Sequence, residues 1–466
     1  MVSRHALPRG DGIQPSGPPP VSLPTPQLGA FKYRDFRLYW LSQVVSNVTA
    51  WMQLLATGWL VLELTNSPAL LGVNAFIQAI PILAFALLGG TVADRYDRRK
   101  LIRVVTAIQI IPDAVLAALV WTGTVRVEHI FIYSFLSTTI SSFSNPARNA
   151  WVPSLVPQSA LLSAIALNSI VWQGAAVVGP SVAGLIVATS GITGCFTINV
   201  IGQLLGLGAL LMVRVQAGES APRRTASGWR DLRDGALYAW QAPPVRTILL
   251  CVAFMNFFAR PYQQFLPVFA RDVFEVGPQG LGFMLTAPAA GTIVFGTTLA
   301  LAGRVPLTKT FFAAAFTVAL ALLGFVVTGS FPLALALLFV IGGASTVSIT
   351  VMNTALQEIV EERLRGRTMS LFMTATWGGW RIGALPIGFV AGAWGAPLAV
   401  GLAGVSLLIS LVSTVRSRAI WAIDAQGEGA LEPAPPPSAR EDDSTRSDTV
   451  AAADGLIPPS GRPVPR

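Results

Sequence analysis

The sequence contains little charge and almost no histidine or cysteine. Only 12% of its residues are charged, roughly half the share found in soluble globular proteins. The two histidines lie in the N-terminal tail (His5) and at a predicted helix end (His129), and Cys195 and Cys251 each lie inside an apolar run. They supply neither a disulfide framework nor a histidine or thiol metal site, so we expect no metal and no cofactor. The sequence also lacks the paired acids or nucleophile constellation of an enzyme.

The charge that is present is unevenly distributed. Residues 1–30 and 422–466 are rich in Pro, Gly, Ser and charge, and we expect both to be disordered cytoplasmic tails. The first thirty residues lack an apolar segment, so we expect no cleaved signal peptide. The middle of the chain is nearly free of charge over long runs, and 53% of all residues are hydrophobic. A soluble core cannot absorb so much apolar sequence, so the chain is predicted to be an all-α polytopic membrane protein in a lipid bilayer.

Apolar runs of spanning length predict twelve transmembrane helices, because a helix needs ~20 mostly apolar residues to cross the hydrocarbon. The first six form an N-terminal bundle within residues 31–213, and the last six form a C-terminal bundle within 246–421. A basic cytoplasmic linker, 214–245, joins them. The predicted spans are 38–62, 68–93, 101–121, 128–147, 160–187, 191–213, 246–270, 279–303, 309–328, 331–355, 367–393 and 397–416.

The distribution of basic residues orients these spans. With both termini in the cytoplasm, the inside loops hold 22 Lys and Arg residues and the outside loops hold only Arg126 and Arg271. This is a strong positive-inside bias, which predicts a multi-pass protein of the cytoplasmic (inner) membrane. Because the basic residues alternate with spans and form no single face, we expect no nucleic-acid partner.

The two halves of the chain resemble each other. A shift of 208 residues places Asn145 on Asn353 and Trp172 on Trp380. Parallel repeats of this kind are typical of secondary transporters, whose substrate site lies near the bilayer midplane between the repeats.

The stretch "GGTVADRYDRRK", residues 89–100, follows the second span. Its glycines lack the flanking strand that a nucleotide-binding loop needs. Gly90, Asp94, Arg95, Arg98 and Arg99 match the loop G-x-x-x-D-R-x-G-R-R, which resembles the signature of the major facilitator superfamily, except that Asp97 stands where glycine is usual. Further segments resemble the branch that includes the enterobactin exporter and the macrolide efflux proteins, namely "WLVLELTNSPALLG" (59–72), "NPARNAWVPSLVP" (145–157), "LPVFARDVF" (266–274) and "LRGRTMSLF" (364–372).

This resemblance implies a conformational latch in the loop. Asp94 would face the positive N-terminal end of the eleventh span, near residues 366–370, in only one of two rocking states. Arg95 and Arg98 would pair with it or with the acids at positions 358, 361 and 362. The alternative is that the basic residues, Arg99 above all, only fix topology.

The fifth span contains "WQGAAVVGPSVAGL", residues 172–185. Gly179, Pro180 and Gly184 match part of an exporter motif of the superfamily, so the resemblance implies export. Ordinary small-residue packing between membrane helices is the alternative.

Three charges lie deep in predicted spans, where a charge is costly and usually faces a cavity or a partner. Arg260 in the seventh span is our candidate for contact with an anionic or polar substrate group, and Arg381 in the eleventh is a second. A structural arginine, paired across the bundle or stacked on Trp380, is the alternative for each. Asp113 is the only deep acid and hence the candidate for proton coupling, followed by Glu63.

Polar residues of the central spans complete the predicted site: Asn47, Gln53, Gln263 and Asn353 are candidates for the cavity lining. We therefore expect a monomeric, proton-coupled antiporter that exports a siderophore-like metabolite or an amphipathic drug by alternating access. No Walker A sequence is present to supply ATP chemistry. An importer of the same fold and a non-transporting receptor remain the alternatives.

Overall fold

The computed structural model describes residues 29–214 and 237–416, with side chains except at 86–95 and 363. Within these ranges every regular element is a helix and none is a strand. The two predicted tails and most of the predicted linker lie outside the described residues. So do the side chains of Gly90, Asp94 and Arg95, three of the five residues of the predicted latch.

The N-terminal half consists of long helices that overlap the predicted spans. Helix α5 contains two of them, because the chain reverses at Gly191, whose φ of 71° favours glycine. Short 3-10 turns precede α1 and separate α4 from α5. The long helices are α1 (Arg34–Thr65), α2 (Pro68–Arg95), α3 (Arg98–Trp121), α4 (Val127–Trp151) and α5 (Leu161–Met212).

The C-terminal half contains a broken helix where the sequence predicts one continuous span over 246–270. Helix α7 ends at Ala259, α8 covers Tyr262–Val268, and a π-helical turn follows over Phe269–Val273. The remaining helices are continuous. The elements are α7 (Pro243–Ala259), α8 (Tyr262–Val268), α9 (Gly277–Leu301), α10 (Leu307–Val327), α11 (Phe331–Ile359), α12 (Glu362–Trp394) and α13 (Ala396–Val415).

The break has a local cause. Pro261 has no amide hydrogen to donate, so the run of helical hydrogen bonds is interrupted there. Arg260 and Pro261 nevertheless keep right-handed helical torsions, with φ and ψ of −80° and −25° for Arg260 and of −58° and −20° for Pro261. The freed carbonyls are partly reused, since Gln263 donates its amide to the Arg260 carbonyl at 3.2 Å and Gln264 to that of Pro261 at 2.9 Å. The prediction of an unbroken seventh span was therefore wrong, and Arg260 lies at the interruption.

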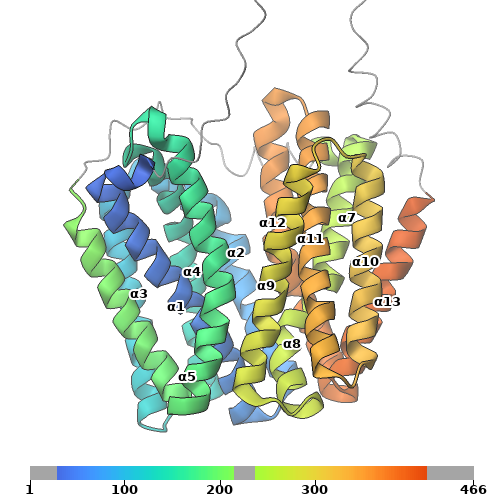
Figure 1. Cartoon of the computed structure of the whole chain (residues 1–466), viewed down its shortest axis with the longest axis horizontal. Coiled ribbons are helices and arrows are strands. Elements are labelled where there is room, and N and C mark those ends of the chain that lie inside the picture. The colour runs from blue at the N-terminus through green and yellow to red at the C-terminus, as the bar shows by residue number, and fades with distance from the viewer. Residues whose placement is uncertain (1–28, 215–236, 417–466) are drawn as a thin grey trace, which may run out of the picture.

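The helices form two bundles that lie side by side (Figure 1). In the N-terminal bundle α1 and α3 pack on α5, and α2 and α3 pack on α4; in the C-terminal bundle α11 packs on α9 and α10, and α12 on α7 and α13. The main contacts between the bundles are α2 with α12 and α5 with α9. The start of α1 and the end of α13 lie on the same side of the molecule, at the top of Figure 1.

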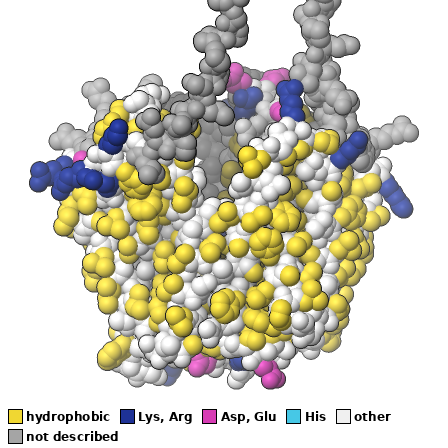
Figure 2. Space-filling view, viewed as in Figure 1, with side chains coloured by type: hydrophobic (Ala, Val, Ile, Leu, Met, Phe, Trp, Pro, Cys, Tyr) yellow, Lys and Arg dark blue, Asp and Glu magenta, His cyan; other side chains and the backbone are white. Residues whose placement is uncertain are grey.

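The surface is that of a membrane protein. In the described part of the chain, eight helical segments are long and apolar enough to cross a bilayer, and one of them is the double segment that contains α5. Figure 2 shows Lys and Arg side chains along the upper rim of this face, acidic side chains near both rims, and a broad band free of charge between them. Exposed leucines, isoleucines and valines of most helices suit contact with lipid in that band.

Candidate substrate site

Small residues hold α2 against α12 near the start of α2. A Cβ atom added at Gly388 would lie 2.9 Å from the Cα of Gly72 and 3.3 Å from the Ala69 carbonyl oxygen. One added at Gly392 would lie 3.1 Å from the Ala69 Cβ. The two backbones approach each other this closely only because these side chains are absent or small.

The second contact between bundles uses the predicted exporter motif. A Cβ at Gly184 would lie 2.7 Å from the Pro278 carbonyl oxygen, and one at Gly282 would lie 2.7 Å from the carbonyl oxygen of Pro180. Beside them the Ser181 and Thr286 hydroxyls hydrogen-bond across the interface at 2.7 Å. Pro180 and Gly184 of the motif therefore pack against the first turns of α9, while Gly179 packs against Val48 and Trp51 of α1.

Arg271 forms a third contact, which the sequence analysis placed only in an outside loop. Its Nη1 donates to the Leu62 carbonyl at 3.1 Å and to Asn66 Oδ1 at 2.7 Å, both at the end of α1. Its other nitrogens pair with Asp272 of the same turn, at 2.6 Å from Nε to Oδ1. A residue of the C-terminal bundle thus binds one of the last carbonyls of a helix of the N-terminal bundle and the side chain that follows this helix. We call this contact the Arg271 clasp.

All three contacts lie toward the same end of the molecule, the end at which α1, α5 and α12 reach the turns 66–67, 191 and 395. We call this the closed end. Toward the other end, large apolar side chains that face the region between the bundles stay exposed: Leu83 is 42%, Trp172 44% and Trp377 42% exposed. We call this the open end. The Trp172 and Trp377 rings still touch across the bundles, with centroids 6.4 Å apart, and Trp51 lies on the other side of Trp172 at 6.3 Å.

Two arginines lie where α7 and α12 meet. Arg260 caps α7 at the break, and Arg381 lies on α12 with its guanidinium carbon 4.4 Å from the centre of the Trp380 ring. The two positive charges are close enough to repel each other. Helix α12 approaches α7 closely here, because a Cβ at Gly383 would overlap the backbone of Phe257. The interrupted helix and the small residues of α12 thus bring both cations to one place.

Polar atoms around this pair lack partners within the described ranges. Arg381 reaches only Gln78 Oε1 on α2, at a long 3.5 Å, and its Nε has no acceptor. The Trp380 Nε1 and the Asn256 Oδ1 are also buried without a hydrogen bond. Unsatisfied buried groups of this kind are uncommon in native structures and mark sites that a ligand or water completes.

An apolar cavity lies next to the arginines. It has a volume of about 430 Å³, is open on one side and is lined by residues of α2, α7 and α12. Three of its lining residues lie within one helical turn of the two cations, namely Phe257, Gly379 and Ile382. The others extend toward the open end: Leu83, Leu250, Ala253, Phe254, Leu371, Thr374 and Ala375.

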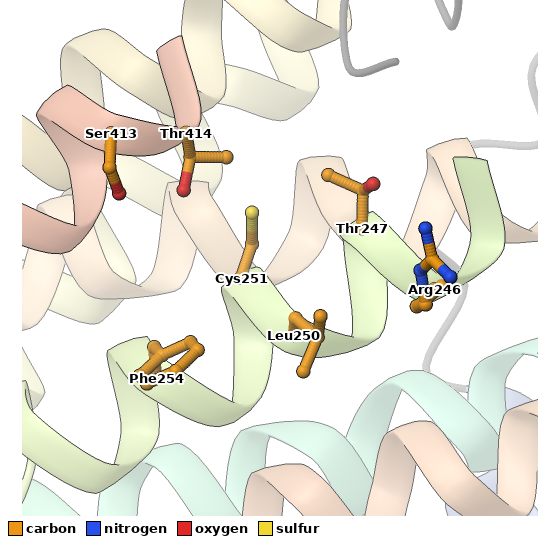
Figure 3. A pocket seen from close by; sticks show the side chains of 7 residues that line it. All are labelled: Arg246, Thr247, Leu250, Cys251, Phe254, Ser413 and Thr414. Atoms are coloured by element: carbon orange, nitrogen blue, oxygen red, sulfur yellow. The ribbon is translucent and has the colours of Figure 1, made fainter. Parts of the chain in front are cut away.

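A second hollow of about 280 Å³ lies between α7 and α13 near the start of α7, and Figure 3 shows Cys251 pointing toward Ser413 and Thr414 there. Its hydroxyls already bond to their own helices: Thr247 to the Pro243 carbonyl, and Ser413 and Thr414 to that of Ser410. Each hydroxyl group of this hollow thus already donates a hydrogen bond within its own helix. The cavity beside the arginines is therefore the better candidate for the substrate site.

Asp113 lies inside the N-terminal bundle and is only 2% exposed. Its Oδ1 accepts hydrogen bonds from the Tyr133 hydroxyl at 2.9 Å and from Gln109 Nε2 at 3.0 Å, while its Oδ2 has no partner within the described chain. Asn199 of α5 lies near the same carboxyl group and donates to Gln53 Oε1 of α1 at 3.0 Å. The acid therefore lies beside a hydrogen bond that joins α5 to α1, although its own helix lies at the periphery.

The structure separates the other predicted lining residues from the cavity. Gln53 lies in the core of the N-terminal bundle, so its assignment to the cavity was wrong: the partner Asn199 on α5 holds it there. Asn47 donates to the Gln43 carbonyl of its own helix at 2.7 Å, and Asn353 accepts from Gln357 one turn later. Gln263 is half-buried beside the break.

Glu63 is exposed at the end of α1 and lies apart from Asp113 and both arginines. Of the predicted site residues, the structure therefore brings together Arg260 and Arg381 and places Gln263 on the helix that follows the break.

The basic loop between α2 and α3 binds backbone within its own bundle. Arg98 donates to the Ala150 carbonyl at 3.0 Å, and Arg99 to that of Arg214 at 3.2 Å. In the described part of the chain Arg98 pairs with none of the acids at positions 358, 361 and 362, while its expected pairing with Asp94 lies outside the described side chains. Asp97, which departs from the family pattern, accepts the Lys100 amide at 3.1 Å and so caps α3.

Two further arginines have structural roles that sequence reasoning missed. Arg148 is buried and binds Gln43 of α1, Ser144 of α4 and Thr106 of α3, the last at 2.9 Å. Arg103 donates to the last carbonyls of α5, among them that of Val213 at 2.8 Å. A cation at the C-terminal end of a helix is favourable. The sequence feature that could have predicted these roles is a basic residue close to the end of a helix. That feature does not identify the residue that the arginine contacts.

Comparison with known proteins identifies the family. The sequence pattern of the transmembrane secretion effectors matches residues 25–452. The chain belongs to this family of the major facilitator superfamily. It is therefore a membrane transporter by family, as its relatives are.

Three relatives of known activity are efflux or transport proteins. The chain is 25% identical to the staphyloferrin A transporter of Staphylococcus aureus over 69% of its own length and 81% of that protein. It is 26% identical to the multidrug efflux pump Tap of Mycobacterium tuberculosis, over 72% and 82%. For the macrolide efflux protein A of Streptococcus pyogenes the identity is 24%, over 59% and 69%.

Solved structures support the same fold at low sequence identity. The nucleoside transporter NupG superposes with a TM-score of 0.68 at 14% identity, over 82% of this chain and all of that one. A bacterial homologue of the lysosomal transporter Spinster, in an inward-facing state, gives 0.62 at 15% identity over 84% and 95%. The two-bundle arrangement of this transmembrane secretion effector is thus that of major facilitator transporters.

Proposed function

We propose that this family member is a secondary-active, proton-coupled exporter of a siderophore-like metabolite or an amphipathic drug. In the proposal it crosses the cytoplasmic membrane twelve times with both termini in the cytoplasm. This proposal is supported above all by the observation that only one end of the molecule is closed. The contacts of α2 with α12, of α5 with α9 and of Arg271 with α1 all lie at the closed end. Such contacts must break if the bundles rock about a central site.

Export in particular rests on two observations. The relatives that are efflux proteins share the family, and Pro180 and Gly184 of the exporter motif pack between the bundles, whereas Gly179 packs against α1 of its own bundle. With the proposed topology the open end faces the cytoplasm, where an exporter takes up its cargo. The exposed Trp172 and Trp377 provide apolar surface for a bulky molecule on that side.

Asp113 is the proposed proton carrier. It is buried, and one of its oxygens is free of partners in the described part of the chain. Beside this carboxyl group, the hydrogen bond between Asn199 and Gln53 joins α5 to α1, which contacts the C-terminal bundle at the Arg271 clasp. A change in the charge of the Asp113 carboxyl group therefore alters a network that includes α1. The end of α1 must separate from Arg271 when the closed end opens.

The test compares small molecules in cells and spent medium by untargeted mass spectrometry. The gene is deleted, restored, or restored with Asp94→Asn or Asp97→Asn, and protein levels are checked by immunoblot. An exporter leaves its cargo in the cells and missing from the medium of the deletion strain. A compound left unused in the medium would instead make the protein an importer, and no difference in any compound would favour the non-transporting alternative.

The two substitutions form a matched pair within one loop. Asp94→Asn removes the predicted latch carboxylate and should slow the appearance of cargo in the medium. Asp97→Asn should leave it unchanged, because asparagine caps a helix about as well as aspartate does. Equal effects of the two would contradict the latch.

A further inference from the structure

The arginine pair and the cavity beside it are chemically unlike each other. The pair offers two cations and free donors, whereas the cavity walls are formed by leucine, isoleucine, alanine, phenylalanine and glycine with a single threonine. A ligand that fills both must carry negative charge at one end and an apolar body at the other.

Among the residues whose side chains the structure describes, no acid is placed to neutralise the pair. Helices α7 and α8 contain no Asp or Glu, and the only acid of α12 is Glu362, at its first residue. On α2, Gln78 contacts Arg381, and the only acid of this helix is Asp94, sixteen positions later. Asp113 is held by Tyr133 in the other bundle.

A purely structural role explains this arrangement poorly. Buried arginines that serve structure alone are paired with carboxylates or with several neutral acceptors, as Arg148 is with Gln43, Ser144 and Thr106. Arg260 donates no hydrogen bond among the described residues, and Arg381 donates one long one. The pair also repels itself. A bound carboxylate would relieve the repulsion and accept from the free Arg381 Nε and Trp380 Nε1.

We propose that the site selects amphipathic organic anions, with the carboxylate between Arg260 and Arg381 and the apolar body in the cavity toward the open end. This proposal rests on the proposed function, because the bound anion is the transported cargo only if the protein is an exporter. It also excludes a class of molecule: a lipophilic cation of the same size meets two positive charges and no acid, so it is rejected.

The test uses three fluorescent probes with one body and different charge. Dansylglycine is an anion, dansylglycinamide is neutral and dansylcadaverine is a cation. The purified full-length protein is placed in phosphatidylcholine nanodiscs, and binding is followed by energy transfer from tryptophan, because Trp51, Trp172 and Trp377 lie between the bundles. Empty nanodiscs give the background of partition into lipid.

We expect dansylglycine to bind at least about tenfold more tightly than the other two probes, since a charged hydrogen bond contributes that much. In Arg260→Gln and Arg381→Gln its advantage should be lost. Arg304→Gln, which removes an exposed charge between α9 and α10, should change nothing. Arg381→Lys should keep part of the affinity that Arg381→Gln loses, because lysine keeps the charge but not the flat guanidinium.

Two measurements keep the test decisive if a variant folds poorly. Citrate, a polyanion without an apolar body, should displace dansylglycine from the wild-type protein only weakly, and tetraethylammonium should not displace it. The melting temperature of wild type should rise with dansylglycine, and that of Arg381→Gln without ligand should not fall, because one of two repelling charges is gone. Equal affinity for all three probes, or a strongly destabilised Arg381→Gln, would overturn the proposal. Selective anion binding by a protein that moves nothing out of cells would leave the site intact and refute export alone.

Discussion

The Arg271 clasp makes a specific prediction about which state the protein occupies. Its guanidinium donates to the Leu62 carbonyl at 3.1 Å and to Asn66 Oδ1 at 2.7 Å, so it joins the turn after α8 to the end of α1. Both bonds exist only while the closed end is closed. Arg271→Ala should therefore destabilise this state relative to the one in which that end is open, and should do so without touching the cavity.

The magnitude follows from the two bonds across the interface. A hydrogen bond to a charged group contributes about 1.5–3 kcal/mol when buried. The Arg271 side chain is 29% exposed, so we take about half of that for each bond. The sum of about 1.5–3 kcal/mol corresponds to a shift of about 10- to 150-fold in the ratio of the two states. Asp272→Asn is the matched control, because it removes a bond within the same turn and none between the bundles.

Distances between spin labels measure the shift. Labels at Lys100 and Glu362, exposed at the starts of α3 and α12, report the separation of the bundles at the open end. The native Cys195 and Cys251 are buried and are replaced by alanine. We expect Arg271→Ala to move population from the long to the short distance, and Asp272→Asn to leave it in place. Identical distributions for the two variants would refute the clasp as a determinant of the state.

Other predictions concern the seal, the coupling and the stability. Gly184→Ala should shift the same distances as Arg271→Ala, because its Cβ would lie 2.7 Å from a backbone oxygen of α9, whereas Gly174→Ala on the same helix meets nothing within 4 Å and should have no effect. Asp113→Asn should abolish transport driven by a pH gradient in proteoliposomes but preserve exchange of substrate at equal pH; loss of both would contradict a role in coupling. Arg148→Met should lower the thermal unfolding temperature in detergent, at a cost of about 1–3 kcal/mol for each buried acceptor left without a partner, and an unchanged temperature would show that the Gln43 and Thr106 contacts do not hold the bundle.

The sequence was sufficient for the positions of the helices because the bilayer imposes a single length scale. Runs of about twenty apolar residues ended by "TNSP" or "WGAP" leave few alternatives, and the described helices overlap every predicted span. The break at Arg260–Pro261 was missed although the signal was present: a proline after an arginine deep in an apolar run. Interrupted helices are the feature that marks transporter sites.

The site was harder to predict because helix rotation decides it. Gln53 and Arg381 both looked like lining residues, but Gln53 turns into its own bundle toward Asn199, whereas Arg381 turns toward Gln78 of the other bundle. A span that is apolar on all sides carries no amphipathic signal to fix its rotation. Arg271 was missed for a different reason, since its partner is a carbonyl 209 residues away and backbone acceptors leave no trace in the sequence.

The two ends of the molecule hold different kinds of contact, and this difference bears on how a ligand drives the cycle. The closed end is held by glycine contacts and by the Arg271 bonds, all of which are lost on opening. The open end exposes Leu83, Trp172 and Trp377, whose apolar surface would be buried when that end closes. The contacts that are lost when the closed end opens are therefore offset by the apolar surface that is buried when the open end closes. This offset brings the free energies of the two conformations closer together. Under that balance, a bound anion that relieves the repulsion of Arg260 and Arg381 needs only a small difference in affinity between the states to reverse their populations.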